Sequence, residues 1–178
     1  MAISLSDLPA VVADYVKNNV SVKVSAVQHG ISTVLQPHEK GTFNVTVTNC
    51  GALRFTDLIY ELSVSPGSVA KLISPEGPAI FALDGIGGNP IPNGSEVEKL
   101  FLCGIPDVSW TSVDGGASVT TEDLEVKTQE TLGDATIECT LHVTVDQNSL
   151  FPAEHAGSPT TRKITVKRPA WWIARRVV

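Results

Sequence analysis

Cys139 and His142 are the pair of residues in this chain that could together perform nucleophilic chemistry, because a cysteine thiolate needs a nearby base. They lie three positions apart in a stretch where apolar and polar residues alternate. On a β-strand, positions that differ by three face opposite ways, so one of the two side chains lies in the core and the other outside. The pattern therefore predicts a buried structural thiol at Cys139 rather than a catalytic one.

Histidine-based metal binding has little support in the sequence. The histidines are spread over three predicted loops and one exposed strand face, and no two of them have the spacing of metal ligands. We expect all four to be solvated: His29, His38, His142 and His155.

Calcium has a separate set of candidate ligands, because hard cations bind clustered carboxylates and carbonyls. Asp146 and Glu154, with Asp84 or Asp114, could form such a cluster at one end of a β-sandwich. The favoured interpretation is that Asp146 starts an Asx-type turn and that Glu154 is solvated. The sequence therefore predicts no metal and no cofactor.

The chain lacks the common catalytic and nucleotide-binding motifs, namely Gly-x-Ser-x-Gly, His-Glu-x-x-His, the P-loop and the EF-hand loop. The glycines after Asp84 do not form a dinucleotide-binding loop, because the third glycine and the helix of that motif are absent and Pro90 would interrupt a helix. The three cysteines, Cys50, Cys103 and Cys139, show no Cys-x-x-Cys spacing, and their pairing is left open. We therefore predict that the protein is not an enzyme.

A short amphipathic helix is predicted at the N-terminus. Apolar residues follow helical spacing from Leu5 to Val16, Ser4 or Ser6 can cap the start, and the helix is expected to end near Asn19. Its apolar stripe is expected to cover one end or edge of the sheets, and docking to a partner is the alternative.

From residue 20 onward the chain alternates with a period of two, which is the pattern of β-strands with one face in a core. Turn sequences rich in glycine, proline, asparagine and aspartate separate the runs. Seven to nine short strands of this kind predict an all-β fold, an immunoglobulin-like antiparallel β-sandwich. The clearest runs and then the weaker ones are 20–26, 42–48, 58–65, 136–146, 164–166, 69–73, 79–83, 97–103 and 118–128.

Two stretches resemble a known family. Residues 35–51 run through a turn with proline and glycine into a strand that ends Asn-Cys-Gly, and residues 133–146 form a strand that ends on an aspartate. Followed by Glu154 and a last strand over 160–167, this pattern is similar to the CARDB-type immunoglobulin-like modules of bacteria and archaea.

The resemblance implies a β-sandwich over about residues 20–167. The family is associated with adhesion, surface-layer and multidomain extracellular proteins, which implies a place at the cell surface or outside the cell. Two features depart from the family pattern. The paired asparagines are replaced by residues 155–160, His-Ala-Gly-Ser-Pro-Thr. The segment 104–132 is longer than a simple hairpin needs, which predicts either a binding loop or an extra strand pair.

Charge is divided unevenly along the chain. The net charge is -6, and all 19 acidic residues lie at or before Glu154. Residues 1–161 carry 7 basic and 19 acidic groups, a net of -12, whereas residues 162–178 carry 6 basic groups and no acid. Because the acidic body repels phosphates, nucleic acid is not expected as a partner.

The C-terminal stretch 169–178 combines two tryptophans with two arginines and contains no acid. Such a composition suits a partner's groove, a membrane interface or the stacking of arginine on an aromatic ring. The alternative is that a tryptophan folds back over the sandwich and the arginines pair with its acidic body. The residues expected to anchor a partner are Trp171, Trp172, Arg175 and Arg176.

These features predict an N-terminal helix over 1–19, an immunoglobulin-like sandwich over 20–168 and a basic, aromatic extension over 169–178. The expected function is a non-catalytic protein-interaction or assembly module, which contacts a protein partner or a second copy. A carbohydrate- or calcium-dependent binding module is the alternative, with Trp110 as the main aromatic residue for sugar, and an enzyme is the least favoured. We find no signal peptide and no run of about 18 apolar residues, so localisation is left open, as is membrane contact through the C-terminus.

Overall fold

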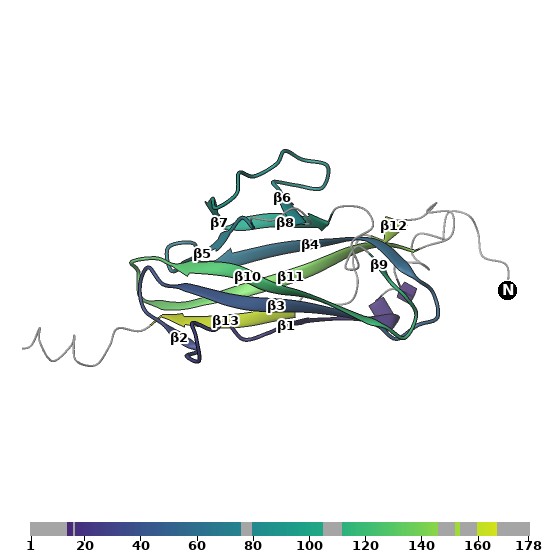
Figure 1. Cartoon of the computed structure of the whole chain (residues 1–178), viewed down its shortest axis with the longest axis horizontal. Coiled ribbons are helices and arrows are strands. Elements are labelled where there is room, and N and C mark those ends of the chain that lie inside the picture. Colours follow the sequence, from purple (N-terminus) through teal and green to yellow (C-terminus); the bar gives the residue numbers. More distant parts are fainter. Residues whose placement is uncertain are drawn as a thin grey trace, which may run out of the picture.

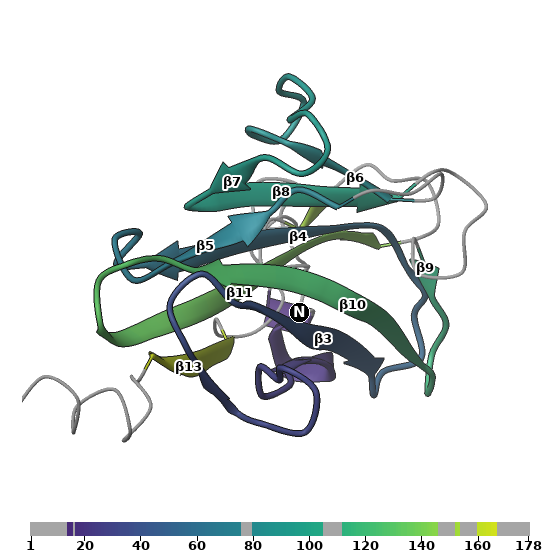
Figure 2. The ribbon, with the colours of Figure 1, turned by 60° about the vertical axis from the view of Figure 1, so that its left-hand side comes forward.

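The computed structural model describes residues 14–15, 17–75, 80–104, 112–145, 152–153 and 160–166. These residues form two β-sheets that face each other (Figures 1 and 2). The first sheet has the order β1 (Val20–Val24), β3 (Lys40–Asn49), β10 (Ser118–Thr128), β5 (Ala70–Ile73) and β7 (Glu96–Val97). The second sheet has the order β2 (Val34–Leu35), β13 (Thr160–Val166), β11 (Gly133–Val145), β4 (Phe55–Ser65), β8 (Lys99–Gly104) and β6 (Ile80–Leu83).

Two further strands extend the second sheet, β12 (Pro152–Ala153) beside β11 and β9 (Ser112–Val113) beside β4. Among the described strands, neighbours are antiparallel except for β2 and β13. The predicted all-β antiparallel sandwich is therefore confirmed. The described part of the long segment 104–132 contains β9, which joins the second sheet, and β10, which joins the first.

Alternation in the sequence decides which face of each strand enters the core. In β3, Phe43, Val45 and Val47 are buried, while the polar residues between them are partly exposed. The same period holds along β4 and β11, so the two sheets share one apolar interior. Both the clear and the weak runs predicted from the sequence correspond to strands. Of the thirteen described strands, four have only two residues, which leaves nine longer ones.

The described part of the predicted N-terminal helix lies against one end of the sandwich. Residues 14–15 and 17–19 are helical, and Tyr15 packs on the core with its ring 6.3 Å from that of Phe55. The amide of Ala52 donates a hydrogen bond to the Tyr15 hydroxyl (3.1 Å), and the amide of Cys50 donates to the Asn19 carbonyl (2.7 Å). The helix end thus satisfies backbone groups of the loop after β3.

Asn49, at the end of β3, organises the same end of the sandwich from inside. Its side chain is buried, donates to the carbonyls of Leu53 (2.5 Å) and Val113 (3.4 Å), and accepts a hydrogen bond from the amide of Gly51 (3.0 Å). A buried polar group of this kind stabilises a fold only while its partners are satisfied. Asn49 therefore ties the loop after β3 to β9.

The two long sides of the sandwich differ. On one side, the edge strand β1 of the first sheet meets β13 of the second, and Arg162 Nε donates a hydrogen bond to the Val24 carbonyl across the gap. On the other side, the chain crosses between the sheets through residues 91–98, where the amide of Ser74 donates to the Ser95 carbonyl (2.9 Å). This second side contains the features described in the next subsection.

Replacing Asn49 with alanine is expected to lower the free energy of unfolding by about 2–3 kcal/mol, because buried carbonyls and an amide lose their partner. Urea denaturation measures this loss. The matched control is Asn18→Ala, at an exposed helical position, for which we expect a change below about 0.5 kcal/mol. Equal effects of the two substitutions would contradict the role given to Asn49.

Candidate interaction site

One edge of β10 is left open because β5 is short. β5 pairs with β10 only over residues 126–128. On one side, residues 118–121, 124 and 125 of β10 pair with β3. On the other side, no strand of the described ranges pairs with them. We call residues 118–125 the open β10 edge.

Hydrogen-bonding groups of the backbone point outward from the start of this edge. In an antiparallel ladder, alternate residues direct their amide and carbonyl groups to alternate neighbours. The amide of Asn49 donates to the carbonyl of Ala117 (2.9 Å), so Ala117 and every second residue after it face β3. Ser118 and Thr120 therefore direct their backbone groups to the open side.

The other end of the edge follows the same rule, after a bulge. The amide of Thr128 donates to the carbonyl of Glu39 (2.9 Å), the residue before β3, so alternation places the backbone groups of Glu125 on the side of β5. Between these parts the register shifts, and Asp123 has a positive φ of 57° with its amide donating to Asn44 Oδ1 (3.1 Å). The bulge turns the acidic residues of the edge toward solvent.

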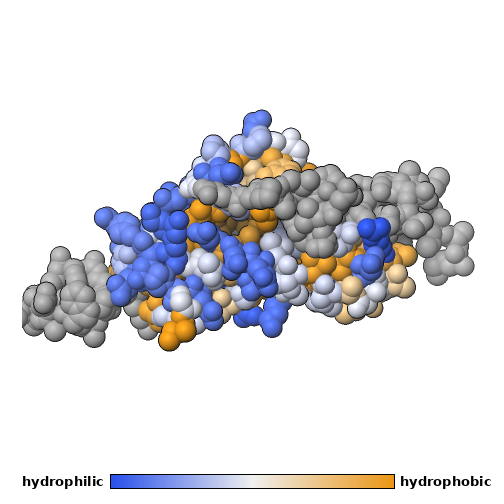
Figure 3. Space-filling model, in the orientation of Figure 1, coloured by the Kyte–Doolittle hydropathy of each residue, from blue (hydrophilic) through white to orange (hydrophobic). Residues whose placement is uncertain are grey.

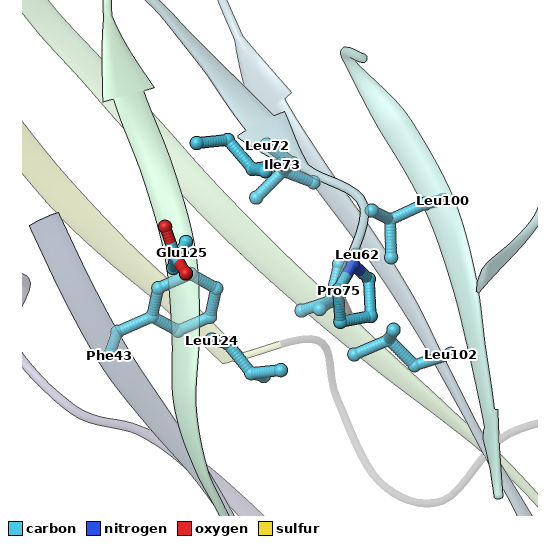
Figure 4. A pocket seen from close by; sticks show the side chains of 9 residues that line it. All are labelled: Phe43, Leu62, Leu72, Ile73, Pro75, Leu100, Leu102, Leu124 and Glu125. Carbon is cyan, nitrogen blue, oxygen red and sulfur yellow. The ribbon is translucent and has the colours of Figure 1, made fainter. Parts of the chain in front are cut away.

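An apolar recess lies beside the open β10 edge, between the two sheets (Figure 4). Its empty space is about 180 Å³ with the open solvent in front of it included, so it is a shallow depression in the surface. Leu72 and Leu124 of the first sheet face Leu62, Leu100 and Leu102 of the second. Apolar residues also reach the surface in the band above β10 (Figure 3). The recess can therefore receive a small apolar group that approaches along the edge.

The rim of the recess is acidic. Glu122 and Asp123 are exposed, and Glu125 is the charged residue that lines the recess. Lys40 Nζ lies 3.7 Å from Glu125 Oε2. Three carboxylates and one ammonium group leave this edge with a negative balance, which favours a partner with basic groups.

A separate polar cluster lies on the outer face of the second sheet. Glu61 of β4 lies between Lys99 of β8 (Nζ to Oε1, 3.0 Å) and His142 of β11 (Nε2 to Oε2, 3.5 Å). Phe101 packs beside both, with Lys99 Nζ 5.4 Å from its ring centre and the His142 ring 6.2 Å away. The His142 side chain is only 12% exposed, so the prediction that it is solvated was wrong. The alternating sequence correctly predicted the face of the sheet on which His142 lies, but it did not predict the neighbours of His142 on other strands.

The contacts in this cluster stabilise the ionised form of Glu61. Burial alone raises the pKa of Glu61, but the contacts with Lys99 and His142 outweigh it, so its pKa lies below the usual value. Glu61 therefore stays ionised and contacts Lys99 and His142 on the two neighbouring strands. Such cross-strand pairs stabilise a sheet.

The cysteines do not turn this cluster into a nucleophilic site. Cys139 is buried on the core face of β11, as predicted, and burial, followed by the nearby Glu61 charge, raises the pKa of its thiol to about 12. Cys103 shares the outer face with His142, but Ile59 lies between them in the cross-strand row. Burial also raises the pKa of Cys103. All three cysteines are free thiols, so no disulfide joins them.

The candidate metal ligands are not brought together. In the described ranges, no group of three or more histidine, cysteine, aspartate or glutamate residues could hold a metal ion. Asp84 Oδ1 accepts a hydrogen bond from the amide of Asn89 (2.7 Å), and Asp114 Oδ1 lies 3.3 Å from Arg54 Nε. Asp84 thus has a partner in its own loop, and Asp114 pairs with Arg54 of the loop between β3 and β4.

Several residues singled out from the sequence lie outside the described residues, so their roles stay predictions. None of the helical residues that the structure describes belongs to a segment long and apolar enough to span a bilayer. The remaining histidines behave as expected, since the side chains of His29 and His38 are about half exposed. The residues outside the description are Trp110, Asp146, Glu154, His155, Trp171, Trp172, Arg175 and Arg176.

Sequence reasoning missed both the cluster partners and the open edge. One signal was the continuous apolar run Leu100 to Leu102, which is typical of a strand covered on both faces. Another was Pro75, two residues after the run that forms β5, because proline cannot extend a ladder. Neither signal tells which strands lie side by side.

Comparison with known proteins supports the fold. No protein-family model and no curated protein matches the chain. A cohesin module from a Clostridium perfringens family 33 glycoside hydrolase is similar over 85% of this chain and 97% of its own, with 8% identity and a TM-score of 0.51. A chain of a type I cohesin–dockerin complex from Clostridium thermocellum is similar over 84% of this chain and 100% of its own, with 8% identity and a TM-score of 0.50.

A CARDB domain from Pyrococcus furiosus is also among the similar structures, as the sequence resemblance indicated. It has 11% identity and a TM-score of 0.43, and the match covers 83% of this chain and 94% of that domain. The fold assignment depends on the cohesin modules and on the strand pairing. With the two-sheet arrangement, these establish an immunoglobulin-like β-sandwich.

Replacing Glu61 with glutamine is expected to make the free energy of unfolding less dependent on pH in the acid range. Because the folded pKa of Glu61 lies below the usual 4.5, its carboxylate stabilises the fold above that pH, and this contribution is lost as the pH falls through the folded pKa. Urea denaturation along an acid series measures the effect. Glu138→Gln, at an exposed position of β11, is the control, and identical acid profiles for the two variants would contradict the assignment.

Thiol labelling is expected to follow burial. At mildly alkaline pH, iodoacetamide should modify the exposed Cys50 in the native protein, whereas Cys139 should react only after unfolding, since its raised pKa and burial suppress the thiolate. Mass spectrometry of tryptic peptides gives both rates. Native labelling of Cys139 as fast as that of Cys50 would show that its thiol is accessible and reactive.

Proposed function

We propose that this chain is a non-catalytic protein-interaction module that binds an extended segment of a protein partner along the open β10 edge. The observation that carries the proposal is the combination of an unpaired strand edge with an apolar recess beside it. An unpaired edge is a template for a further strand, because it presents amide and carbonyl groups at ladder spacing.

The mechanism is strand addition. Backbone groups of Ser118 and Thr120 would pair with the incoming segment, and each such hydrogen bond contributes about 0.5–1.5 kcal/mol. One aliphatic side chain of the partner would enter the recess and contribute about 1.5–3 kcal/mol by burial. The recess then selects side-chain size, and the acidic rim selects charge.

The described chemistry supports binding rather than catalysis. The two thiols that share β8 and β11 with the polar cluster have raised pKa values, and the Glu61 carboxylate lies between the Lys99 and His142 side chains. Such a cluster stabilises the sheet on which it lies. We therefore assign no reaction to it.

The comparison with cohesin modules is in keeping with a protein partner. One of the similar chains comes from a complex of a cohesin with a dockerin, so a sandwich of this general shape occurs in a protein complex. At 8% identity the contact residues do not carry over. The binding residues of this chain are those of its own open edge.

Site-specific photo-crosslinking tests the proposal. Benzoylphenylalanine at position 120, on the open β10 edge, is expected to give protein adducts in cells of the source organism, and mass spectrometry identifies the adduct. The matched control is position 138, which is exposed on β11 away from the edge. The identified protein should then bind the purified chain and lose binding when Thr120 is replaced with proline, which removes the outward amide donor from the edge.

The crosslinking experiment has outcomes that either support or exclude the open β10 edge as a binding surface. Adducts from position 120 that recur with the purified pair support the proposed function. The absence of protein adducts at position 120, or equal adducts at positions 120 and 138, would show that the edge is not a binding surface.

A further inference from the structure

We propose that the segment bound by the open β10 edge is the basic, aromatic stretch 169–178 of a second copy of this chain. The inference rests on the proposed function, because it names the partner of the same edge. It joins two features that have so far been separate, namely the acidic rim of the recess and the charge division along the sequence.

Charge complementarity is the first argument. The open β10 edge carries Glu122, Asp123 and Glu125, with Lys40 as a cationic neighbour. The stretch 169–178 carries two arginines and no acid. Opposite potentials attract and orient two surfaces before contact.

Composition and length are the second argument. The open β10 edge has eight residues, 118–125, and the stretch has ten. Besides the arginines, the stretch contains two tryptophans, an isoleucine and two valines. The aliphatic residues match the apolar lining of the recess. Tryptophan and arginine are the residues that most often dominate binding at interfaces.

The position of β13 favours a second copy over the same chain. Val166 ends β13, which is separated from β8, at the recess, by β11 and β4. Three strand spacings amount to roughly 14 Å, whereas the three residues from 166 to 169 span at most about 10 Å. The side of β13 is also closed toward the first sheet by Arg162. The first residue of the stretch therefore cannot lie on its own open β10 edge, so its own chain can offer the edge only the later residues. A second copy can supply the whole stretch.

Each copy then carries two different binding surfaces. The donor is its stretch 169–178, and the acceptor is its open β10 edge, which receives the stretch of another copy. A contact between two different surfaces of the same chain is heterologous, so it joins copies head to tail into a ring or an open chain. The arginine–carboxylate contacts at the rim are exposed to solvent, so we expect salt to weaken the association.

Charge reversal with rescue tests the inference on the full chain. Sedimentation velocity over a concentration series is expected to show self-association of the parent protein. Reversing the donor (Arg175→Glu with Arg176→Glu) or the acceptor (Glu122→Lys with Glu125→Lys) should each weaken it at least about tenfold. Combining all four substitutions should restore it, because the charges are again opposite.

The control reverses two exposed acids away from the open β10 edge, Glu130→Lys with Glu138→Lys, and should leave self-association unchanged. The circular dichroism spectrum checks that each variant is folded. Because the arginine pair lies outside the described strands, its reversal remains informative if the acceptor variant is less stable.

Three results would overturn the inference: a parent chain that stays monomeric, equal weakening by the control pair, or no rescue by the fourfold variant. The crosslinking experiment distinguishes these from failure of the proposed function. Adducts at position 120 with a different protein would retain strand addition and exclude the second copy as its partner.

Discussion

The early end of β5 is the constraint on which the candidate site depends. Pro75 follows two residues after β5, on the side where alternation would direct its amide to β10, and proline has no amide hydrogen to donate. Ser74, between them, directs its backbone to the β7 side, where it is held by Ser95 and Ile91. The chain therefore leaves β10 after three pairs. The open β10 edge and the recess beside it both follow from this departure, because no described strand continues where β5 stops.

Side-chain hydrogen bonds and ion pairs close other parts of the described sandwich, in contrast to the side with the open β10 edge. Arg162 bridges the two sheets on the opposite side, and Tyr15 and Asn49 satisfy the loops at one end. On the outer face of the second sheet, Glu61 joins three strands through Lys99 and His142. Each of these contacts fixes the scaffold, so that the open β10 edge is presented by a rigid support.

Much of the fold could be predicted from the sequence because the period of two is a local property. The runs around Val45, Tyr60 and Ile137 correspond to strands with the predicted faces, and Cys139 lies on the core side as alternation required. The order of the strands in each sheet, by contrast, is not a local property of the sequence. It depends on contacts between residues far apart in sequence, such as Glu125 with Lys40, and a single sequence does not contain these pairings.

The same distinction explains the candidate site. Alternation gave the face of His142 but not the carboxylate that lies beside it, because Glu61 is on another strand. The recess was not predicted at all, since its leucines come from both sheets. The charge division was readable from the sequence, and the structure adds an acidic edge to which the basic stretch 169–178 is complementary.

Amide hydrogen exchange, resolved by residue with NMR, tests the central claim about the open β10 edge most directly. In dilute protein, the amide of Thr120 should exchange quickly and that of Val119, which faces β3, slowly, because alternation directs only Thr120 outward. In concentrated protein, the Thr120 amide should become protected as a second copy pairs with the edge. A Thr120 amide as protected as that of Val119 in the dilute protein, or one that stays unprotected at every concentration, would contradict this account.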